Sequence, residues 1–277
     1  MQDAFAYCAE LVRAADRDRF LASLFAPAER RDSLFALYAF NVEIGRVREV
    51  ARETLPGEIR LRWWCDVLNG ERGGEGNANP VAAALLGAIE QHGLAVDKLI
   101  ALIEAHRFDL YDEPMASVAD LEAYAKKTFS AAIGLAAQIL GADAAPAAGP
   151  AGIASGIAGL LRAFPLHAAR RQLYVPADLL TRHGVSSDDI FAGRSSPAVN
   201  AALAELRALA RQRLAAAREH LTTLPREAHP AFLPVALVRP SLDRMDRSDA
   251  FAPGELSPWR RQWLIWRAAR NPARIAG

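Results

Sequence analysis

Apolar residues recur every three or four positions along nearly the whole chain, which is the spacing of one face of an α-helix. The alternation of apolar and polar residues that marks a β-strand is hard to find, and strong helix formers such as Ala, Leu, Arg and Glu are frequent. The helical spacing is clear in residues 28–52, where the apolar positions include Leu34, Leu37, Tyr38, Ile44 and Val47. The pattern predicts an all-α protein with about nine to eleven helices.

The same pattern gives approximate bounds for the helices. Pro27 and Pro258 each suit a first helical turn, and Ser257 is a suitable N-cap. The glycine-rich segment 71–80 predicts a loop, and 175–193 predicts a turn-rich connector with short helical pieces. The predicted helices are 3–16, 28–52, 58–68, 81–92, 96–111, 118–140, 151–169, 197–221 and 258–270.

Composition is that of a folded chain with a substantial core. Hydrophobic residues make up 52% and charged residues 23% of the 277 positions, which excludes intrinsic disorder as the main state. We expect one domain over 1–277, with 258–277 as a C-terminal amphipathic helix and tail, because no repeat or shift in composition marks a boundary. The first residues lack the pattern of a secretory signal, and the uncharged stretch 144–161 is too rich in Ala, Gly and Pro for a transmembrane helix.

The net charge and the positions of the Cys and His residues limit which partners and metal sites are plausible. The 33 basic and 32 acidic residues leave a net charge of +1, which argues against nucleic acid as a partner. Cys8 and Cys65 are far apart and predict reduced thiols in a cytoplasmic protein. The six histidines form no pair at ligand spacing, so the sequence predicts no zinc site.

Four segments have amino-acid sequences, and an order along the chain, that are characteristic of a known protein family. They are 24–47 (LFAPAERRDSLFALYAFNVEIGRV), 79–94, 106–141 and 170–176 (RRQLYVP). Together they resemble the squalene/phytoene synthase family, from about Phe5 to Leu221. The resemblance implies a single-domain, all-α isoprenoid (prenyl) synthase fold around a central helix-lined cavity. Members of that family join two prenyl diphosphates head to head, and two aspartate-rich motifs hold the magnesium that binds the diphosphates.

The chain departs from the family at both aspartate-rich motifs. Where the family has Asp-Asp-x-x-Asp after a Tyr-Ala-Phe stretch, the corresponding residues of this chain are Gly45, Arg46 and Glu49. The second motif should lie within 144–177, where no Asp or Glu occurs and where Pro165 should bend or break the helix. Because Mg²⁺ prefers carboxylate oxygens, we expect neither a metal nor another cofactor here.

These departures resemble one branch of the family, the phytoene-synthase-like assembly factors of mitochondrial complex I and their bacterial relatives. This resemblance implies a non-catalytic protein of respiratory complex I biogenesis, whose partner is a complex I subunit or an assembly intermediate. Two alternatives stay open. One is an active head-to-head prenyl transferase, which would need magnesium, and the other is a lipid or isoprenoid binder without chemistry.

The resemblance also supplies candidate residues for the remaining cavity. Asp109 either faces the cavity, or is a helix-terminal acid, or pairs with a nearby arginine such as Arg107. Four arginines, with His167, are expected to converge at the cavity, namely Arg46, Arg162, Arg170 and Arg171. They either hold an anionic ligand or partner segment without metal, or pair with acids such as Glu43 and Glu49, or are simply solvated. The candidates are Tyr38, Asn41, Gly45, Arg46, Glu49, Asp109, Tyr124, Arg162, His167, Arg170, Arg171 and Tyr174.

The C-terminal helix carries a second candidate surface. Trp259, Trp263 and Trp266 share one helical face, and arginines flank them. Such a face either lies in the interface of the inner membrane, where Trp and Arg are favoured, or belongs to a closing helix that docks on the core with its arginines outward. The first alternative adds a peripheral membrane contact to the cytoplasmic location.

Overall fold

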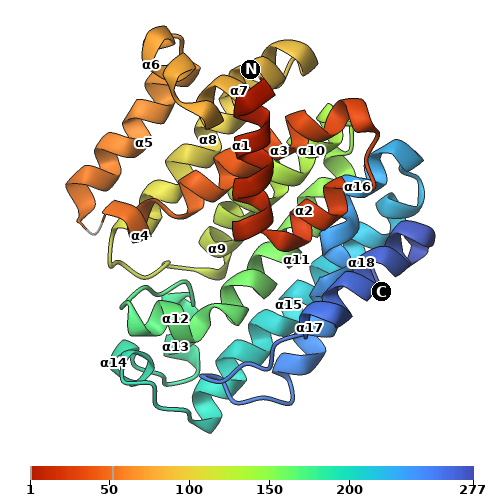
Figure 1. Cartoon of the computed structure of the whole chain (residues 1–277). Coiled ribbons are helices and arrows are strands. Elements are labelled where there is room, and N and C mark those ends of the chain that lie inside the picture. The colour runs from red at the N-terminus through yellow and green to blue at the C-terminus, as the bar shows by residue number, and fades with distance from the viewer. Residues whose placement is uncertain (1, 52) are drawn as a thin grey trace.

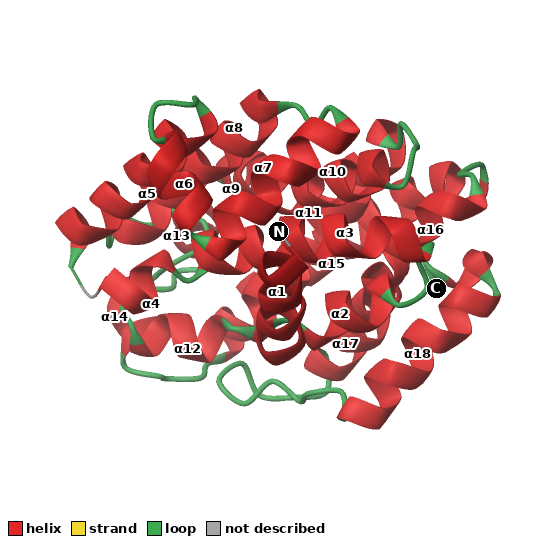
Figure 2. Ribbon diagram, turned by 45° about the horizontal axis from the view of Figure 1, so that its top comes forward, coloured by secondary structure: helices red, strands yellow, loops and turns green. Residues whose placement is uncertain are grey.

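The computed structural model describes residues 2–51 and 53–277, and the regular structure of these residues is helical (Figure 1). Figure 2 shows helices and loops without a strand in this part of the chain, where a single bridge joins Asp249 and Ala252. The prediction of an all-α protein is therefore confirmed.

Most of the helices follow one another through short connections. The α-helices are α1 (Gln2–Ala15), α2 (Arg17–Ser23), α3 (Ala28–Gly45), α4 (Val47–Ala51), α5 (Thr54–Leu68), α6 (Gly73–Ala78), α7 (Pro80–His92), α8 (Val96–His106), α9 (Val118–Ala125), α10 (Ala131–Ile139), α11 (Ala145–Arg162), α12 (Phe164–Ala169), α13 (Ala177–Arg182), α14 (Ser187–Phe191), α15 (Pro197–Thr222), α16 (His229–Phe232), α17 (Val238–Met245) and α18 (Pro258–Arg270). Shorter helical turns are η1 (Arg107–Leu110), the π-helical η2 (Lys126–Ser130), η3 (Arg226–Ala228), η4 (Leu233–Leu237) and η5 (Pro272–Arg274).

Hydrogen bonds at two helix starts include the N-cap predicted at Ser257 and one at Asn79 that was not predicted. The Ser257 side chain accepts the backbone N–H of Arg260 at 3.4 Å, and Pro258 lies in the first turn of α18. The side chain of Asn79 accepts the N–H of Ala82 at 3.0 Å in front of α7. Such caps satisfy backbone donors that a helix leaves free at its start. The predicted starts of α7 and α18 are accordingly within one residue of the observed ones.

The predicted helix 28–52 is divided in the structure. Helix α3 ends at Gly45, Arg46 leaves the helical conformation with ψ near 7°, and α4 begins at Val47. Glycine weakens a helix interior, which favours the break at this position. The predicted end at Arg52 lies outside the described residues.

Prolines account for the bounds of the next long helix. Helix α11 begins before the predicted 151–169, because Pro146 fits its first turn and needs no N–H partner there. It ends at Arg162, and α12 starts anew with Pro165 in its first turn. The break expected at Pro165 is therefore confirmed.

Other differences come from short turns that apolar periodicity does not resolve. The predicted helix 96–111 tightens into η1 after α8, and 118–140 contains η2 between α9 and α10. The predicted loop 71–80 contains α6. Helix α2 and the elements from η3 to α17, within 222–257, were not predicted. The described residues form eighteen α-helices, more than predicted, because long periodic stretches are broken and short helices lack a periodic pattern.

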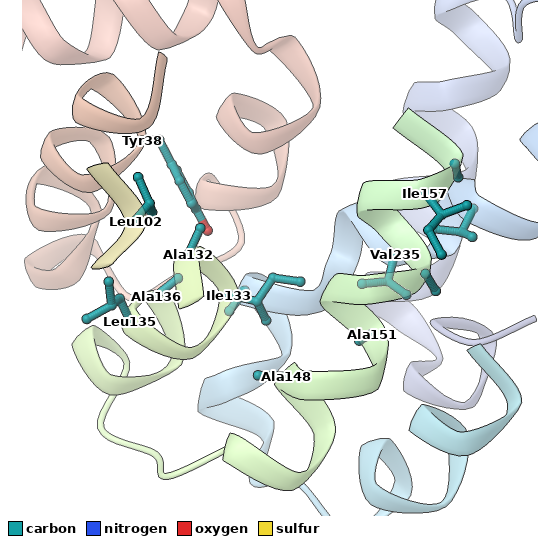
Figure 3. Packing of buried hydrophobic residues seen from close by; sticks show 14 of the residues in the cluster. Tyr38, Leu102, Ala132, Ile133, Leu135, Ala136, Ala148, Ala151, Ile157 and Val235 are labelled. Carbon is teal, nitrogen blue, oxygen red and sulfur yellow. The ribbon is translucent and has the colours of Figure 1, made fainter. Parts of the chain in front are cut away.

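Helix α11 lies at the centre of the molecule and packs along α15, while α1, α3 and α7 pack together on one side (Figure 1). In Figure 3, Tyr38 of α3 and Leu102 of α8 lie close to Ala132 of α10, and Val235 of η4 lies near Ile157 of α11. These side chains belong to one cluster of buried apolar residues that extends from α1 to the residues after η5. Within the described ranges, no helix has both the length and the apolar character to cross a membrane.

Small residues let α11 approach η2 closely. A Cβ atom at Gly152 would lie 2.3 Å from Cα and 2.4 Å from the backbone nitrogen of Ser130, so a side chain there requires the backbone of η2 to move. At Gly159, on the same helix, the nearest atom would lie 3.9 Å away, which is an ordinary contact.

We expect Gly152→Ala to lower the free energy of unfolding by about 2 to 3 kcal/mol, because the added methyl group overpacks the contact with η2. The matched variant Gly159→Ala should raise it by roughly 0.5 to 1 kcal/mol, since alanine favours the helix and finds space. Urea denaturation of both variants measures the difference. Similar stability of the two variants would contradict the close approach.

Candidate functional site

A cavity of about 190 Å³ lies where α3, η1, α9, η2, α11 and α12 meet. The fold brings its walls together from segments more than a hundred residues apart in the sequence. Six of the candidate residues line this cavity, namely Asn41, Gly45, Asp109, Tyr124, His167 and Tyr174, together with His106, Thr128, Phe129 and Leu160.

The carboxylate of Asp109 is the centre of a buried hydrogen-bond cluster. The hydroxyl groups of Tyr124 and Tyr174 donate to it at 3.0 and 2.7 Å, and Nδ1 of His106 lies 2.6 Å from its Oδ2. Asp109 therefore faces the cavity, and the alternative pairing with Arg107 is wrong, because Arg107 pairs with two glutamates elsewhere. Sequence reasoning missed His106, although its spacing of three residues from Asp109 was a usable signal.

The two tyrosines are neutral donors. Burial, reinforced by the charge of Asp109, raises the pKa of both Tyr124 and Tyr174 well above the ordinary value for tyrosine. Their rings lie 5.8 Å apart, and Phe108 packs against both. The hydroxyl groups thus stay protonated at neutral pH and hold the carboxylate in one orientation.

His167 forms the opposite wall and is uncharged at neutral pH. Its ring lies 4.6 Å from the ring of Tyr174. Burial lowers the pKa of His167 to about 4, although the negative charge of Asp109 partly opposes this shift. His167 therefore supplies a neutral imidazole rather than a cation.

Glu49 sits in two ion pairs near His167. It accepts a hydrogen bond from Arg170 at 2.7 Å and from Arg46 at 3.3 Å. The hydrogen bond from Arg170 is the main cause that lowers the pKa of Glu49 below its usual value. For Arg46 and Arg170, the structure thus favours the alternative in which the arginines pair with acids. The other acid considered, Glu43, pairs separately with an arginine of α5 at 2.8 Å.

The remaining two arginines do not converge on the cavity, which corrects the expectation from the sequence. Arg162 lies near the ion pair between Arg261 and Asp18, beside α18. Arg171 has a left-handed backbone (φ 56°) that directs its guanidinium over the ring of Phe191, 4.5 Å from the centroid. Arg162 is the last residue of α11, and Arg171 follows the end of α12.

Arg19 of α2 holds the α3 side of the site. Its Nη1 donates to Oδ1 of Asn41 at 2.5 Å, and its guanidinium lies 5.2 Å from the ring centroid of Tyr38. Tyr38 is buried, and burial raises its pKa to about 12. Tyr38 is therefore a neutral packing residue beside the cavity. No pattern in the sequence indicated the role of Arg19.

The residues at the two motif positions do not fit magnesium diphosphate. Gly45 and Arg46 offer no carboxylate, and Glu49 already accepts from two guanidinium groups. The segment that should provide the second set of acids has none. Within residues 2–51 and 53–277, no three His, Cys, Asp or Glu side chains are grouped so that they could hold a metal ion. Mg²⁺ needs hard oxygen ligands, and the donor set here is dominated by cations.

Helix α18 docks on the core and also exposes its tryptophans. Leu264, Ile265 and Ala268 are buried beneath it. Trp259 is 82% exposed, Trp263 50% and Trp266 46%. The face predicted from the sequence is thus present at the surface of a docked helix, which combines features of both alternatives.

The helical architecture around this cavity is that of isoprenoid synthases. A dehydrosqualene synthase, solved in complex with a ligand, superposes with a TM-score of 0.82 over 97% of this chain and 96% of that one, at 18% identity. This similarity shows the fold and confirms the expected fold class.

Residues 12–267 match the family described as Squalene/phytoene synthase, and the chain belongs to that family. The protein named NADH dehydrogenase (ubiquinone) complex I, assembly factor 6, of Rattus norvegicus, is 34% identical over 250 residues, which cover 89% of this chain and 75% of the relative. A phytoene synthase of Thermus thermophilus is 29% identical over 208 residues, which cover 73% of this chain and 69% of the relative.

We expect Tyr174→Phe to lower the free energy of unfolding by about 2 kcal/mol, because it removes a hydrogen bond to a buried carboxylate. Tyr111→Phe is the matched control, since Tyr111 donates to Glu58 at 2.8 Å but is 46% exposed. The control should change stability by less than about 0.5 kcal/mol. Denaturant titration distinguishes the two, and equal effects would mean that Tyr174 does not support Asp109.

We expect stability to fall as the pH drops from about 6.5 towards about 4, because unfolded His167 gains a proton that the folded state excludes. Within this range, His167 lowers the free energy of unfolding by up to about 1.4 kcal/mol for each unit that the pH falls. Above this range, His167 does not reduce the free energy of unfolding. Thermal denaturation at several pH values should show a shallower dependence in His167→Gln. An unchanged dependence in that variant would assign the effect to other groups.

Proposed function

We propose that this chain acts in the biogenesis of respiratory complex I and does not transfer prenyl groups. Its similarity to proteins named complex I assembly factor 6 extends over most of its length. We further propose that its partner is a complex I subunit or an assembly intermediate, and that it works in the cytoplasm at the inner membrane.

The pairing of Glu49 with Arg46 and Arg170 is the main support for the proposal that the protein does not transfer prenyl groups. Ionisation of an allylic diphosphate requires cations that neutralise the departing pyrophosphate, and carboxylates must hold those ions. Here the acid at the first motif position is already neutralised by two protein cations. This supports a family member in which the site no longer promotes ionisation.

The size of the cavity supports the same proposal. Pockets that enclose a ligand of moderate size have volumes of about 300 to 1,000 Å³. The cavity beside Asp109 measures about 190 Å³, and the adjoining space around Phe164 and Leu121 measures about 10 Å³. Side chains therefore fill most of the interior where two long prenyl chains would have to lie. A binding role for the interior would need a smaller ligand than the substrates of the family.

We expect the purified protein to form no hydrocarbon from farnesyl or geranylgeranyl diphosphate with magnesium and NADPH. An active phytoene synthase is the positive control for this assay. Deletion of the gene should remove most NADH:quinone oxidoreductase activity from membranes, and the wild-type gene should restore it. Product formation would establish the transferase alternative, while normal oxidoreductase activity after deletion would refute the role in complex I.

Glu49→Gln tests whether the paired acid takes part in function. Because Glu49 is partly exposed and its ion pairs contribute little stability, the variant should fold and should restore oxidoreductase activity as well as the wild type. A folded Glu49→Gln protein that fails to restore activity would show that this acid serves chemistry or binding. Extraction and mass spectrometry of bound lipids from the same preparations test the lipid-binder alternative.

A further inference from the structure

A second cavity, of about 310 Å³, lies between α17, α18 and the residues that follow α18. We call it the arginine pocket, because six guanidinium side chains contribute to its wall. They come from three separate parts of the chain and are Arg239, Arg244, Arg247, Arg260, Arg267 and Arg274.

Asp and Glu side chains of the described residues do not form ion pairs with the arginines of the arginine pocket. Its acidic lining residue, Asp243, accepts from Arg211 of α15 at 3.1 Å. Among the described residues, none of the six pocket arginines forms an ion pair with an Asp or Glu. Nε of Arg267 is buried without a hydrogen-bond partner, and Arg239 donates to the backbone oxygen of Gly277 at 3.5 Å. Guanidinium groups gathered in this way match the oxygens of a phosphate group.

The local backbone holds part of the pocket in place. A Cβ atom at Gly254 would lie 2.5 Å from Nε of Arg244, so the loop before α18 packs directly on this guanidinium. The N–H of Gly254 donates to Oγ of Ser248 at 3.0 Å, which fixes the loop. These contacts position Arg244, and Arg267 is half-buried, whereas the other pocket arginines are exposed at the surface.

The exposed tryptophans of α18 lie next to the arginine pocket. The guanidinium of Arg267, which lines the pocket, lies 4.4 Å from the ring centroid of Trp263. At 100° per residue, Arg260 and Arg267 project roughly 90° away from the middle of the tryptophan face. When that face rests on a flat surface, the pocket lies at its side, within about 5 Å of the surface, which is the radius of a helix with side chains.

We propose that the arginine pocket binds the phosphate group of an anionic phospholipid while Trp259, Trp263 and Trp266 enter the membrane interface. Charge complementarity selects this occupant, because the pocket presents unpaired cations and anionic lipids present a dense layer of phosphates. The tryptophans favour the same occupant, since their rings prefer the boundary between headgroups and acyl chains. The vesicle assay has no respiratory readout, so its outcome is independent of the proposed role in complex I.

The test is co-sedimentation of the full chain with vesicles at about 0.15 M salt, where charges separated by more than about 8 Å are screened. Wild-type protein should bind vesicles that contain phosphatidylglycerol and should bind phosphatidylcholine vesicles much more weakly. The variant Arg260→Gln/Arg274→Gln removes two exposed pocket cations and should weaken binding about 30-fold. The charge-matched control Lys126→Gln/Lys127→Gln removes two exposed cations of η2 and should bind like the wild type.

Trp259→Ala tests the tryptophan face separately, and its fold should be intact because this side chain is 82% exposed. We expect weaker vesicle binding in this variant and unchanged binding of inorganic phosphate by calorimetry. Equal loss of vesicle binding in both double variants would overturn the pocket. If the protein bound inorganic phosphate but not vesicles, a phospholipid would not be the occupant of the arginine pocket. If it bound both vesicle types equally, the charge of the lipid would not determine binding.

Discussion

The buried carboxylate of Asp109 connects the parts of the chain that form the central cavity. Its oxygens accept from Tyr124 of α9 and from Tyr174 beyond α12, while its backbone carbonyl accepts from Arg48 of α4 at 2.9 Å and from Gln172 at 3.1 Å. A charge inside a protein is costly unless hydrogen bonds replace its lost hydration. Separating these elements would leave the carboxylate or the backbone carbonyl of Asp109 without its donors, so their spacing, which sets the shape of the cavity, depends on this one residue.

The same hydrogen bonds restrict what the cavity can do. Asp109 is surrounded by donors that belong to the protein, and Glu49 is held by Arg46 and Arg170. A metal-diphosphate site needs carboxylates whose oxygens are available to ions. In this chain Asp109 instead accepts hydrogen bonds that support the fold, and Glu49 is held in two ion pairs. The isoprenoid synthase architecture is thus compatible with a function that uses the molecule as a scaffold, because a fold constrains shape more than chemistry.

Apolar periodicity predicted the helical architecture, because it is a property of neighbouring residues. The six candidate residues that line the cavity came from the resemblance to the squalene/phytoene synthase family. The positions of Arg162 and Arg171 were beyond this reasoning, since Arg162 lies beside α18, which is distant in sequence, and Arg171 follows the turn at the end of α12. The left-handed backbone at Arg171 is an example that no periodic pattern encodes. His106 was within reach, as a histidine three residues before Asp109. The arginine pocket could not be predicted, because its residues come from three separate parts of the chain. One of them, α17, has only eight residues, which is too short for a clear periodic pattern.

The distribution of charge, rather than its total, distinguishes the two cavities. Near-equal numbers of basic and acidic residues leave the whole chain almost neutral. At the central cavity Glu49 pairs with both Arg46 and Arg170, so each arginine there has an acidic partner. At α17 the opposite occurs, because Asp243 and Asp246 pair with Arg207 and Arg211 of α15 and leave the neighbouring arginines of the pocket without acids. Since the field at a surface depends on charges within about 8 Å at physiological salt, the pocket stays strongly positive in a nearly neutral protein.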